Sequence, residues 1–193
     1  MIMIRRMNEY ERNKVALFVQ QAMHIQYRCD PHELPELVFV GWRDGELVGA
    51  MALSLSAGEP LPLEETYTLD YGSFPGVFDR AKVAQLGRWV TTVPELSEAL
   101  VYTAIQYAIC KGREWGIGEI KPQVARRFSR MGIRIFRLSG RPVLERIPKS
   151  VRPYYLLPPA PIPAAIALLS AERVLRGRTE TLIAQGKVRF SPP

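Results

Sequence analysis

Two polar side chains stand inside the apolar run VAQLGRWVTTVPE, residues 83–95, which otherwise has the pattern of a buried β-strand leading into a helix. They are Gln85 and Arg88. Because an unpaired charge in a protein core is costly, Arg88 needs a partner that carries a carboxylate. In a functional role Arg88 holds a substrate carboxylate, which arginine binds in a bidentate geometry, or orients a loop that closes over the substrate; in a structural role it binds an acid such as Asp30 or Glu33. Both hypotheses stay open at this point.

The geometry of a strand decides which side chains of this run can act together, because successive residues point to opposite faces of a sheet. In strict alternation one face carries Gln85, Gly87, Trp89 and Thr91, and the other carries Leu86, Arg88, Val90 and Thr92. An interior glycine often marks a β-bulge. A bulge at Gly87 would bring Gln85 and Arg88 toward the same face.

The elements that precede this strand are a short strand, a helical region and a hairpin. Residues 1–6 predict the strand, and residues 8–27 predict one or two helices. Two β-rich runs within ELVFVGWRDGELVGAMALSLS are joined by Asp44 and Gly45, a strong hairpin signal. Residues 58–80 mix glycine, proline, acidic and aromatic residues, and we expect a long surface excursion there.

Strands and helices alternate in the rest of the chain. We expect a strand at 81–91, a helix to about residue 111 that Thr92 and Glu95 cap, a short strand at 117–120, a basic helix at 123–131, strands at 133–140 and 151–158, and a final helix at 164–176. The Pro-rich run PPAPIP before the final helix predicts a linker. The chain then divides into a domain at 1–157 and a C-terminal helical extension at 158–193.

A hairpin followed by alternating strands and helices predicts an α/β (α+β) domain, a mixed sheet with helices on both faces. This order resembles the GNAT acyltransferase fold, whose mostly antiparallel central sheet has a splayed central strand that receives the acyl donor. Within that superfamily QLGRWV is similar to the strand motif of acyl-homoserine lactone synthases and long-chain N-acyl amino acid synthases, roughly Glu-x-Ser-Arg-aromatic-Ala/Val. Arg88, Trp89 and Val90 match the motif. Gln85 and Gly87 stand where glutamate and serine are usual.

The resemblance covers residues 1 to about 157 and implies a thioester donor. The residues favour an acyl carrier protein over free coenzyme A as its carrier. The glycine-rich pyrophosphate loop of GNAT enzymes is missing from TTVPELSEAL, and Glu95 and Glu98 in the first turn of the next helix oppose an anion. A carrier protein places only its phosphopantetheine arm in the enzyme and docks an acidic helix outside.

The net charge of +7 is concentrated in one segment. Residues 121–152 contain ten Lys or Arg residues and one acid, so this segment carries +9 and the rest of the chain −2. A local basic face suits an anionic partner. The acidic helix of a carrier protein is one such partner. Nucleic acid is the alternative, with Phe128 and Phe136 placed to stack on bases.

Acyl transfer needs an acceptor for the proton of the amine and donors for the developing oxyanion. Backbone N–H groups freed where the central strand diverges would supply the donors. An amide cannot replace a glutamate as base, so we expect a water held by Gln85, or a carboxylate of the excursion. The carboxylates in question are Glu64, Glu65 and Asp70. Tyr154 or Tyr155 is the candidate acid for the leaving thiolate.

The candidate site residues fall into three groups. The catalytic candidates are Gln85, Arg88 and Tyr154. The substrate-binding candidates are Tyr27, Arg28 and Trp89, the first two at the helical rim that the resemblance implies for the acceptor. The acyl-donor-binding candidates are Leu86, Val90, Thr91, Thr92, Arg126, Arg127 and Arg130.

Other classes of protein find little support in the sequence. Cys29 and Cys110 are far apart and in no C-x-x-C pair, which favours neither a disulfide framework nor a zinc site, and we expect no metal. No apolar run is long enough to span a membrane. The arginines near the N-terminus follow its apolar run, the reverse of a signal peptide, so we expect a cytoplasmic protein.

Three functions remain open. The first is an N-acyltransferase that moves a medium or long acyl group from an acyl carrier protein or acyl-CoA thioester to an amine such as an amino acid. The second is a GNAT N-acetyltransferase that uses acetyl-CoA, and the third is a basic nucleic-acid-binding protein. An apolar tunnel beside Trp89 would favour the first function, and a short closed pocket the second.

Overall fold

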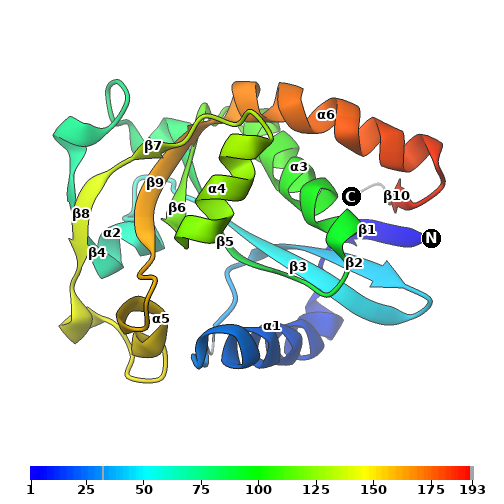
Figure 1. The fold of residues 1–193 in the computed structure, drawn as a ribbon, viewed down its shortest axis with the longest axis horizontal. Helices are drawn as coiled ribbons and strands as arrows, with labels where there is room; N and C mark the ends of the chain where they lie inside the picture. The colour runs from blue at the N-terminus through cyan, green and yellow to red at the C-terminus, as the bar shows by residue number, and fades with distance from the viewer. Residues whose placement is uncertain (32, 192–193) are drawn as a thin grey trace.

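The computed structural model describes residues 1–31 and 33–191, and its centre is an eight-stranded sheet in the order β10-β1-β2-β3-β5-β6-β9-β7 (Figure 1). The strands are β1 (Ile2–Arg6), β2 (Leu37–Arg43), β3 (Glu46–Leu55), β5 (Val83–Thr91), β6 (Trp115–Ile120), β7 (Phe136–Arg137), β9 (Ile162–Ala167) and β10 (Val188–Phe190). A small second sheet pairs β4 (Tyr67–Asp70) with β8 (Ser139–Pro142). In the large sheet β1 with β10 and β5 with β6 are parallel, and the other pairs are antiparallel. The expected mixed, mostly antiparallel sheet is confirmed.

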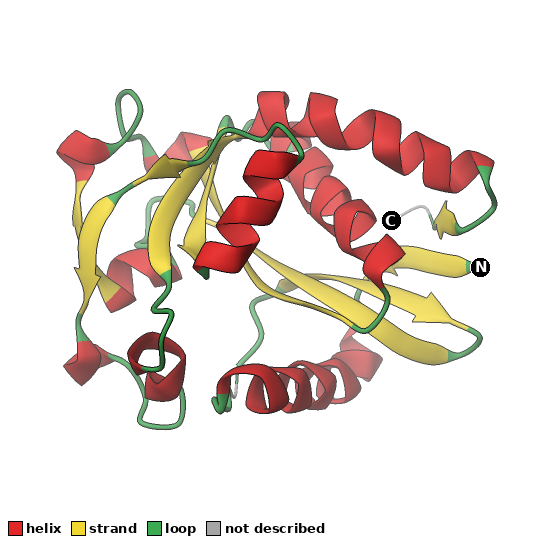
Figure 2. Ribbon diagram, viewed as in Figure 1, coloured by secondary structure: helices red, strands yellow, loops and turns green. Residues whose placement is uncertain are grey.

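Helices cover both faces of the large sheet, as the element order predicts (Figure 2). One face packs against α1 (Arg12–Tyr27), and the other against α3 (Pro94–Cys110) and α6 (Leu168–Ala184). The shorter helices are α2 (Pro62–Thr66), α4 (Pro122–Arg130) and α5 (Arg152–Leu156). Each face has its own apolar core. Val15 and Val19 belong to the α1-side core, and Leu96 and Leu100 belong to the α3-side core.

The hairpin between β2 and β3 turns at Asp44 and Gly45, as predicted. Both residues are left-handed, with φ angles of 52° and 82°. Two left-handed central residues give the tight turn whose twist matches that of the paired strands. The hairpin pairs β2 with β3, and the other edge of β3 pairs with β5, the strand that carries Gln85 and Arg88.

The segment 58–80 is not the surface excursion that its composition predicts. It contains α2 and β4, and its apolar side chains enter the α1-side core. Leu61, Leu63 and Tyr67 are at most 2% exposed. Pro62 made a helix here hard to predict. It occupies the start of α2, a position where a backbone N–H makes no hydrogen bond within the helix, so proline is tolerated there.

The chain after residue 150 departs furthest from the prediction. Residues 152–156 form α5 in place of a strand, because Pro153 suits the first turn of a helix. The Pro-rich run leads into β9, which lies between β6 and β7, and α6 starts at Leu168. A short apolar run such as AAIA does not distinguish a buried strand from a helix. The large sheet therefore continues across the division expected at residue 157.

The capping box expected from Thr92 and Glu95 does not form. Helix α3 begins at Pro94, and Val93 occupies the cap position without a side-chain cap. Thr92 Oγ1 instead donates to Val48 O at 3.3 Å. Proline at the start of a helix has no N–H for a cap to satisfy, so the threonine is free to bind the neighbouring strand.

Strands β5 and β6 pair briefly and then separate. The last register pair between them joins Gln85 to Ile117, and beyond it the described parts of the two strands are no longer paired with each other. Gly118 lies at this point of separation. A Cβ atom there would lie 2.6 Å from Leu86 O, so the absence of a side chain lets the two backbones pass closely before they diverge. The splayed central strand is confirmed.

The other edge of β5 carries a β-bulge. Ala50 of β3 lies opposite Val90 and Ala52 lies opposite Gly87, so β5 contains one residue more than β3 over this stretch. Arg88 adopts the left-handed conformation, with φ at 49°. The bulge expected at Gly87 is confirmed, and Arg88 is its left-handed residue. The inserted residue reverses the alternation of side chains from there on.

We expect Gly118→Ala to lower the free energy of unfolding by about 1–3 kcal/mol, because its methyl group would press on a backbone oxygen that cannot move alone. Gly87→Ala is the matched control, since a Cβ there meets no atom within 4 Å. That variant should be neutral or up to about 1 kcal/mol more stable. Urea unfolding midpoints measure both. Equal losses in the two variants would contradict the role assigned to Gly118.

Candidate functional site

A cavity of about 640 Å³ lies where β5 and β6 separate. Its walls belong to both apolar cores, so it crosses the sheet. Leu86, Trp89 and Phe128 line it from the α3-side core. Tyr27, Tyr154 and Tyr155 line it from the α1-side core. The cavity thus has an apolar end on one face of the sheet and an aromatic, more polar end on the other.

The bulge decides which end each residue of β5 reaches. Trp89 packs in the α3-side core, where its ring stacks on Phe128 with centroids 5.4 Å apart. Val90 packs in the α1-side core. In strict alternation Arg88 would share a face with Leu86, but it interacts electrostatically with Glu119 at the α1-side end. Gln85 and Arg88 therefore lie on one face, as the bulge predicted.

Arg88 lines the cavity without a protein partner among the described residues. None of their ion pairs or side-chain hydrogen bonds includes it. Of the two structural acids considered, Asp30 pairs with His24 Nδ1 at 2.9 Å, and Glu33 also lines the cavity but makes no ion pair with Arg88. A charge inside the fold with no fixed partner suits a site that binds an anionic group.

Gln85 is held by a backbone group. Its Oε1 accepts a hydrogen bond from the N–H of Leu63 at 2.7 Å, near the start of α2. Because an N–H can only donate, the amide oxygen must face Leu63, and the amide nitrogen is the end left free. Gln85 thus ties α2 to β5 at the edge of the cavity.

Glu119 is a functional candidate that the sequence analysis missed. It lines the cavity from β6, and its Oε1 accepts a hydrogen bond from the Tyr155 hydroxyl at 2.8 Å. Its Oε2 is buried without a hydrogen-bond partner among the described residues. Burial raises the pKa of Glu119, while Tyr155, Arg88 and Lys121 act in the opposite direction. An acid inside the apolar strand WGIGEI was the signal that could have identified it.

Lys121 is a structural member of the basic segment. It is 3% exposed, and its Nζ donates to the carbonyl oxygens of Tyr154, Leu157 and Pro159 at 2.6, 3.3 and 2.9 Å. Burial lowers the pKa of Lys121. Three carbonyls therefore hold this cation, which fixes α5 and the following loop to the end of β6.

The tyrosines predicted for the site lie together. Tyr154 is buried, its hydroxyl donates to Glu119 O at 3.5 Å, and its ring lies 5.1 Å from that of Tyr27. Burial raises the pKa of Tyr154 well above its ordinary value. Arg28 is exposed, ends α1 in the left-handed conformation and does not line the cavity. Of the two candidates at the end of α1, Tyr27 therefore lies at the cavity and Arg28 lies outside its lining.

The predicted donor-binding residues separate in the structure. Leu86 lines the cavity, whereas Val90 is core and Thr91 and Thr92 bind Val48 O beyond it. Arg126 and Arg130 are exposed on α4. Arg127 lies over the Trp89 ring at 5.8 Å and pairs with Glu98 at 3.7 Å.

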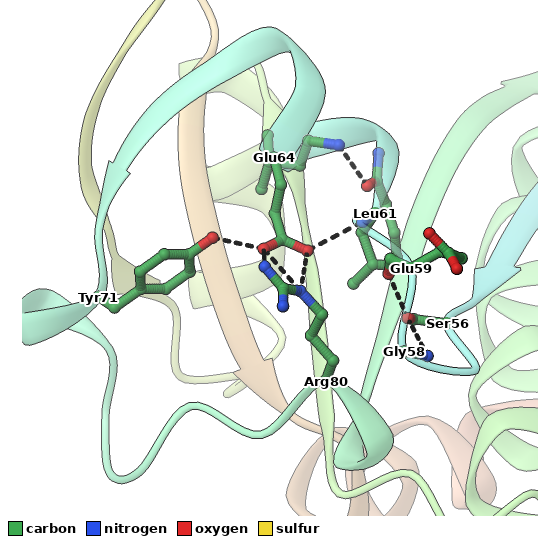
Figure 3. A network of polar contacts seen from close by, with 9 residues as sticks. Ser56, Gly58, Glu59, Leu61, Glu64, Tyr71 and Arg80 are labelled. Atoms are coloured by element: carbon green, nitrogen blue, oxygen red, sulfur yellow. Dashed lines mark hydrogen bonds and ion pairs between the residues drawn. The ribbon is translucent and has the colours of Figure 1, made fainter.

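The acids of the 58–80 segment are mostly committed elsewhere, as Figure 3 shows for Glu64. Arg80 Nη2 binds its carboxylate at 2.7 Å, the Leu61 N–H donates to it at 2.8 Å, and Tyr71 donates as well. Burial opposes this charge, but these donors outweigh burial and hold the pKa of Glu64 below its ordinary value. Asp70 accepts from the Gly72 N–H. Of the three predicted carboxylates, Glu65 borders the cavity.

The described residues give little support to a thiol nucleophile, a metal site or base stacking. Burial raises the pKa of Cys29 to about 11, so its thiol stays protonated at neutral pH. Within residues 1–31 and 33–191 no three His, Cys, Asp or Glu side chains gather as a metal site, and His32 lies outside the described residues. Phe128, the first of the two residues expected to stack on bases, is 7% exposed. No helix in the described ranges is long and apolar enough to cross a membrane.

No protein-family model and no curated protein matches the chain. Solved structures do. A structure of BjaI, a CoA-dependent acyl-homoserine lactone synthase, with SAM and isopentyl-CoA is 12% identical, with a TM-score of 0.66 over 100% of this chain and 94% of that one. TofI in an apo form is 17% identical, with a TM-score of 0.63 over 91% and 96%. FeeM, an N-acyl amino acid synthase from uncultured soil microbes, is 15% identical, with a TM-score of 0.59 over 96% and 98%. This chain has the GNAT-like α+β fold of these proteins.

We expect Glu64→Gln to lower the free energy of unfolding at neutral pH by about 1–2 kcal/mol, a modest loss because Arg80 is partly exposed and solvent screens the pair. The pKa of Glu64 is lower in the folded than in the unfolded chain, so its stabilisation is present above the unfolded pKa and is lost as the pH falls through the folded pKa. Urea unfolding at several pH values should show the two proteins converging in acid. Glu59→Gln, an exposed neighbour, is the control, and a loss of equal size there would refute the assignment.

Proposed function

We propose that this chain, which has the fold of acyl-homoserine lactone synthases and of an N-acyl amino acid synthase, is an N-acyltransferase that moves a medium or long acyl group from a thioester to an amine. The observation that carries the proposal is the cavity that crosses the splayed sheet beside the bulge, with Arg88 at one end and no partner for it among the described residues. Two substrates can approach such a cavity from opposite faces and meet at the separated strands.

The apolar end of the cavity suits the acyl chain. Leu86, Trp89, Val124, Phe128 and Ile166 line it, and none of these side chains carries a charge. Burying methylene groups against such a wall contributes about 0.8 kcal/mol for each CH₂. The volume of about 640 Å³ exceeds what an acetyl group needs, which favours a long acyl chain over the acetyl-CoA alternative.

An acyl carrier protein is the donor that the surface favours. The helix that follows β5 starts with Pro94 and Glu95, which provides poor binding for a pyrophosphate. Arg126 and Arg130 are exposed on α4, beside the residues that line the apolar end. Complementary charge would bring an acidic carrier helix to this side of the molecule and raise the association rate. Acyl-CoA remains the second donor to test.

The acceptor is an amine that also bears a carboxylate, such as an amino acid. Arg88 binds that carboxylate at the aromatic end of the cavity, which Tyr27, Tyr154 and Tyr155 also line. The amine nitrogen then attacks the thioester carbon near the bulge, where backbone N–H groups freed by the separation of β5 and β6 stabilise the oxyanion. Tyr154, which keeps its proton because of burial, donates a hydrogen bond to the leaving sulfur.

A panel of acyl-carrier-protein and acyl-CoA donors, from acetyl to dodecanoyl, with the common amino acids and SAM as acceptors tests the function. We expect release of free thiol and a product that gains the mass of a long acyl group. Arg88→Ala should raise KM for the acceptor about 10- to 100-fold with little change for the donor, because it removes hydrogen bonds to a charged group. Arg43→Ala, an exposed arginine of the hairpin, is the control. No thiol release with any pair would refute the proposal.

Charge reversal on α4 tests the carrier protein. The double variant Arg126→Glu, Arg130→Glu should lower kcat/KM about tenfold or more for acyl carrier protein donors, and added salt should reduce this difference. A short acyl-pantetheine donor, which has no protein surface to dock, should react equally with both proteins. Arg173→Glu with Arg189→Glu makes the same change of charge elsewhere and should have no such effect. Equal losses with both donors would mean that α4 is not the docking surface.

A further inference from the structure

We propose that Glu119 is the general base of this acyl transfer, and that it replaces on β6 the acid that position 85 of β5 lacks. The inference rests on the proposed function. Glu119 lines the cavity on β6, two residues beyond Ile117, the register partner of Gln85. Its side chain lies on the same face of the sheet as Ile117 and Lys121, because alternate residues of a strand share a face. That face holds Arg88 and the aromatic end of the cavity.

The carboxylate of Glu119 is fixed at one oxygen and open at the other. The Tyr155 hydroxyl donates to Oε1 at 2.8 Å, which sets the orientation of the group. Oε2 is buried and has no donor among the described residues. A buried acceptor without a donor is costly, and such atoms in folded proteins are met by water, an ion or a ligand. The amine of an acceptor whose carboxylate binds Arg88 would supply that donor.

The charged and polar groups around Glu119 suit a general base, because no cation among the described residues forms a direct ion pair with its carboxylate. The groups that interact electrostatically with it are Arg88 on β5, Lys121 just after β6, Tyr154 and Tyr155 on α5, Tyr67 on β4 and Cys29 after α1. Neither cation pairs with it directly, and Lys121 is held by three carbonyls. Burial raises the pKa of Glu119. A carboxylate with a raised pKa is a stronger base and gives up its proton less readily than an exposed one.

The other candidates for this role are less suitable. The amide of Gln85 takes no proton, and its oxygen is occupied by the Leu63 N–H. Glu64 is bound by Arg80, which lowers the pKa of Glu64. Glu33 and Glu65 border the cavity but are exposed, so water competes for them.

The step can be written with its protons. The bound ammonium first releases one proton to solvent. The neutral amine nitrogen attacks the thioester carbon, the C–N bond forms, and the proton that the nitrogen then loses goes to Glu119 Oε2. The C–S bond breaks, the thiolate leaves, and the proton passes from Glu119 to sulfur. The products are an amide and a free thiol, and Glu119 is again a carboxylate.

The first experiment uses Glu119→Gln, which keeps an oxygen for Tyr155 and removes the charge. We expect kcat to fall about 100-fold or more while KM for the donor is unchanged. In the wild type we expect kcat/KM to rise with pH above the ordinary titration range of a carboxyl group, and in Glu119→Gln this rise should be absent. Glu114→Gln, an exposed acid before β6 that pairs with Lys82, is the matched control and should keep wild-type activity. Wild-type turnover in Glu119→Gln would overturn the proposal and leave the acyltransferase function standing.

Two measurements separate a base from a structural residue. Hydroxylamine is largely unprotonated at neutral pH and needs little help from a base, so Glu119→Gln should transfer acyl groups to hydroxylamine at close to the wild-type rate. The double variant Gln85→Glu, Glu119→Gln moves the acid to the position that the resembling families use and should recover part of the lost kcat. A variant that reacts slowly with hydroxylamine, and gains nothing from Gln85→Glu, would show that Glu119 has a structural role.

Stability gives a readout independent of activity. The pKa of Glu119 is higher in the folded chain than in the unfolded chain, so protonation favours folding and stability falls as the pH rises through the folded pKa. Glu119→Gln should therefore be at least as stable as the wild type at neutral pH and lose this pH dependence. A less stable variant would indicate that a buried water links Glu119 to Tyr67, whose hydroxyl also has no hydrogen-bond partner within the described residues, and would overturn the proposal. A wild type without any acyl transfer refutes the proposed function itself.

Discussion

The separation of β5 from β6 is the constraint on which the rest of the molecule depends. Beyond Gln85 and Ile117 two strands at the centre of a sheet give up their pairing, and buried backbone groups need partners. The fold tolerates the opening because each strand is held from its other side, β5 by β3 and β6 by β9. Lys121 adds a polar anchor at the end of β6. The opening is thus a stable feature of the sheet, held by the strands on either side.

The bulge in β5 determines what enters this opening. One inserted residue turns Arg88 to the α1-side face while Trp89 stays on the other, so a single strand serves both ends of the cavity. The left-handed backbone of Arg88 carries a conformational cost that a side chain of this size rarely accepts. Strain of this kind persists where the surrounding structure compensates for it, here through the pairing of β5 with β3 on both sides of the bulge.

The sequence predicted the features that depend on local chemistry. Asp44 and Gly45 predicted the hairpin, and the interior glycine of QLGRWV predicted the bulge that brings Gln85 and Arg88 together. The sequence did not predict the features that depend on pairing between strands distant in the chain. Strand β9 has the composition of either a helix or a strand, and only its place between β6 and β7 decides. Glu119 was overlooked because its burial comes from α5 and β4, which the sequence analysis assigned to a strand and a surface excursion.

The position of β9 has a consequence for how the protein is made. During synthesis β6 and β7 leave the ribosome before β9, yet neither strand has the partner that they share until residues 162–167 arrive to lie between them. The outer wall of the cavity is therefore completed late, by contacts between residues distant in the chain, which are slow to form. Until then one edge of β6 is unpaired and exposed to other chains. The nascent protein passes through a stage in which its central strands are present and its site is not.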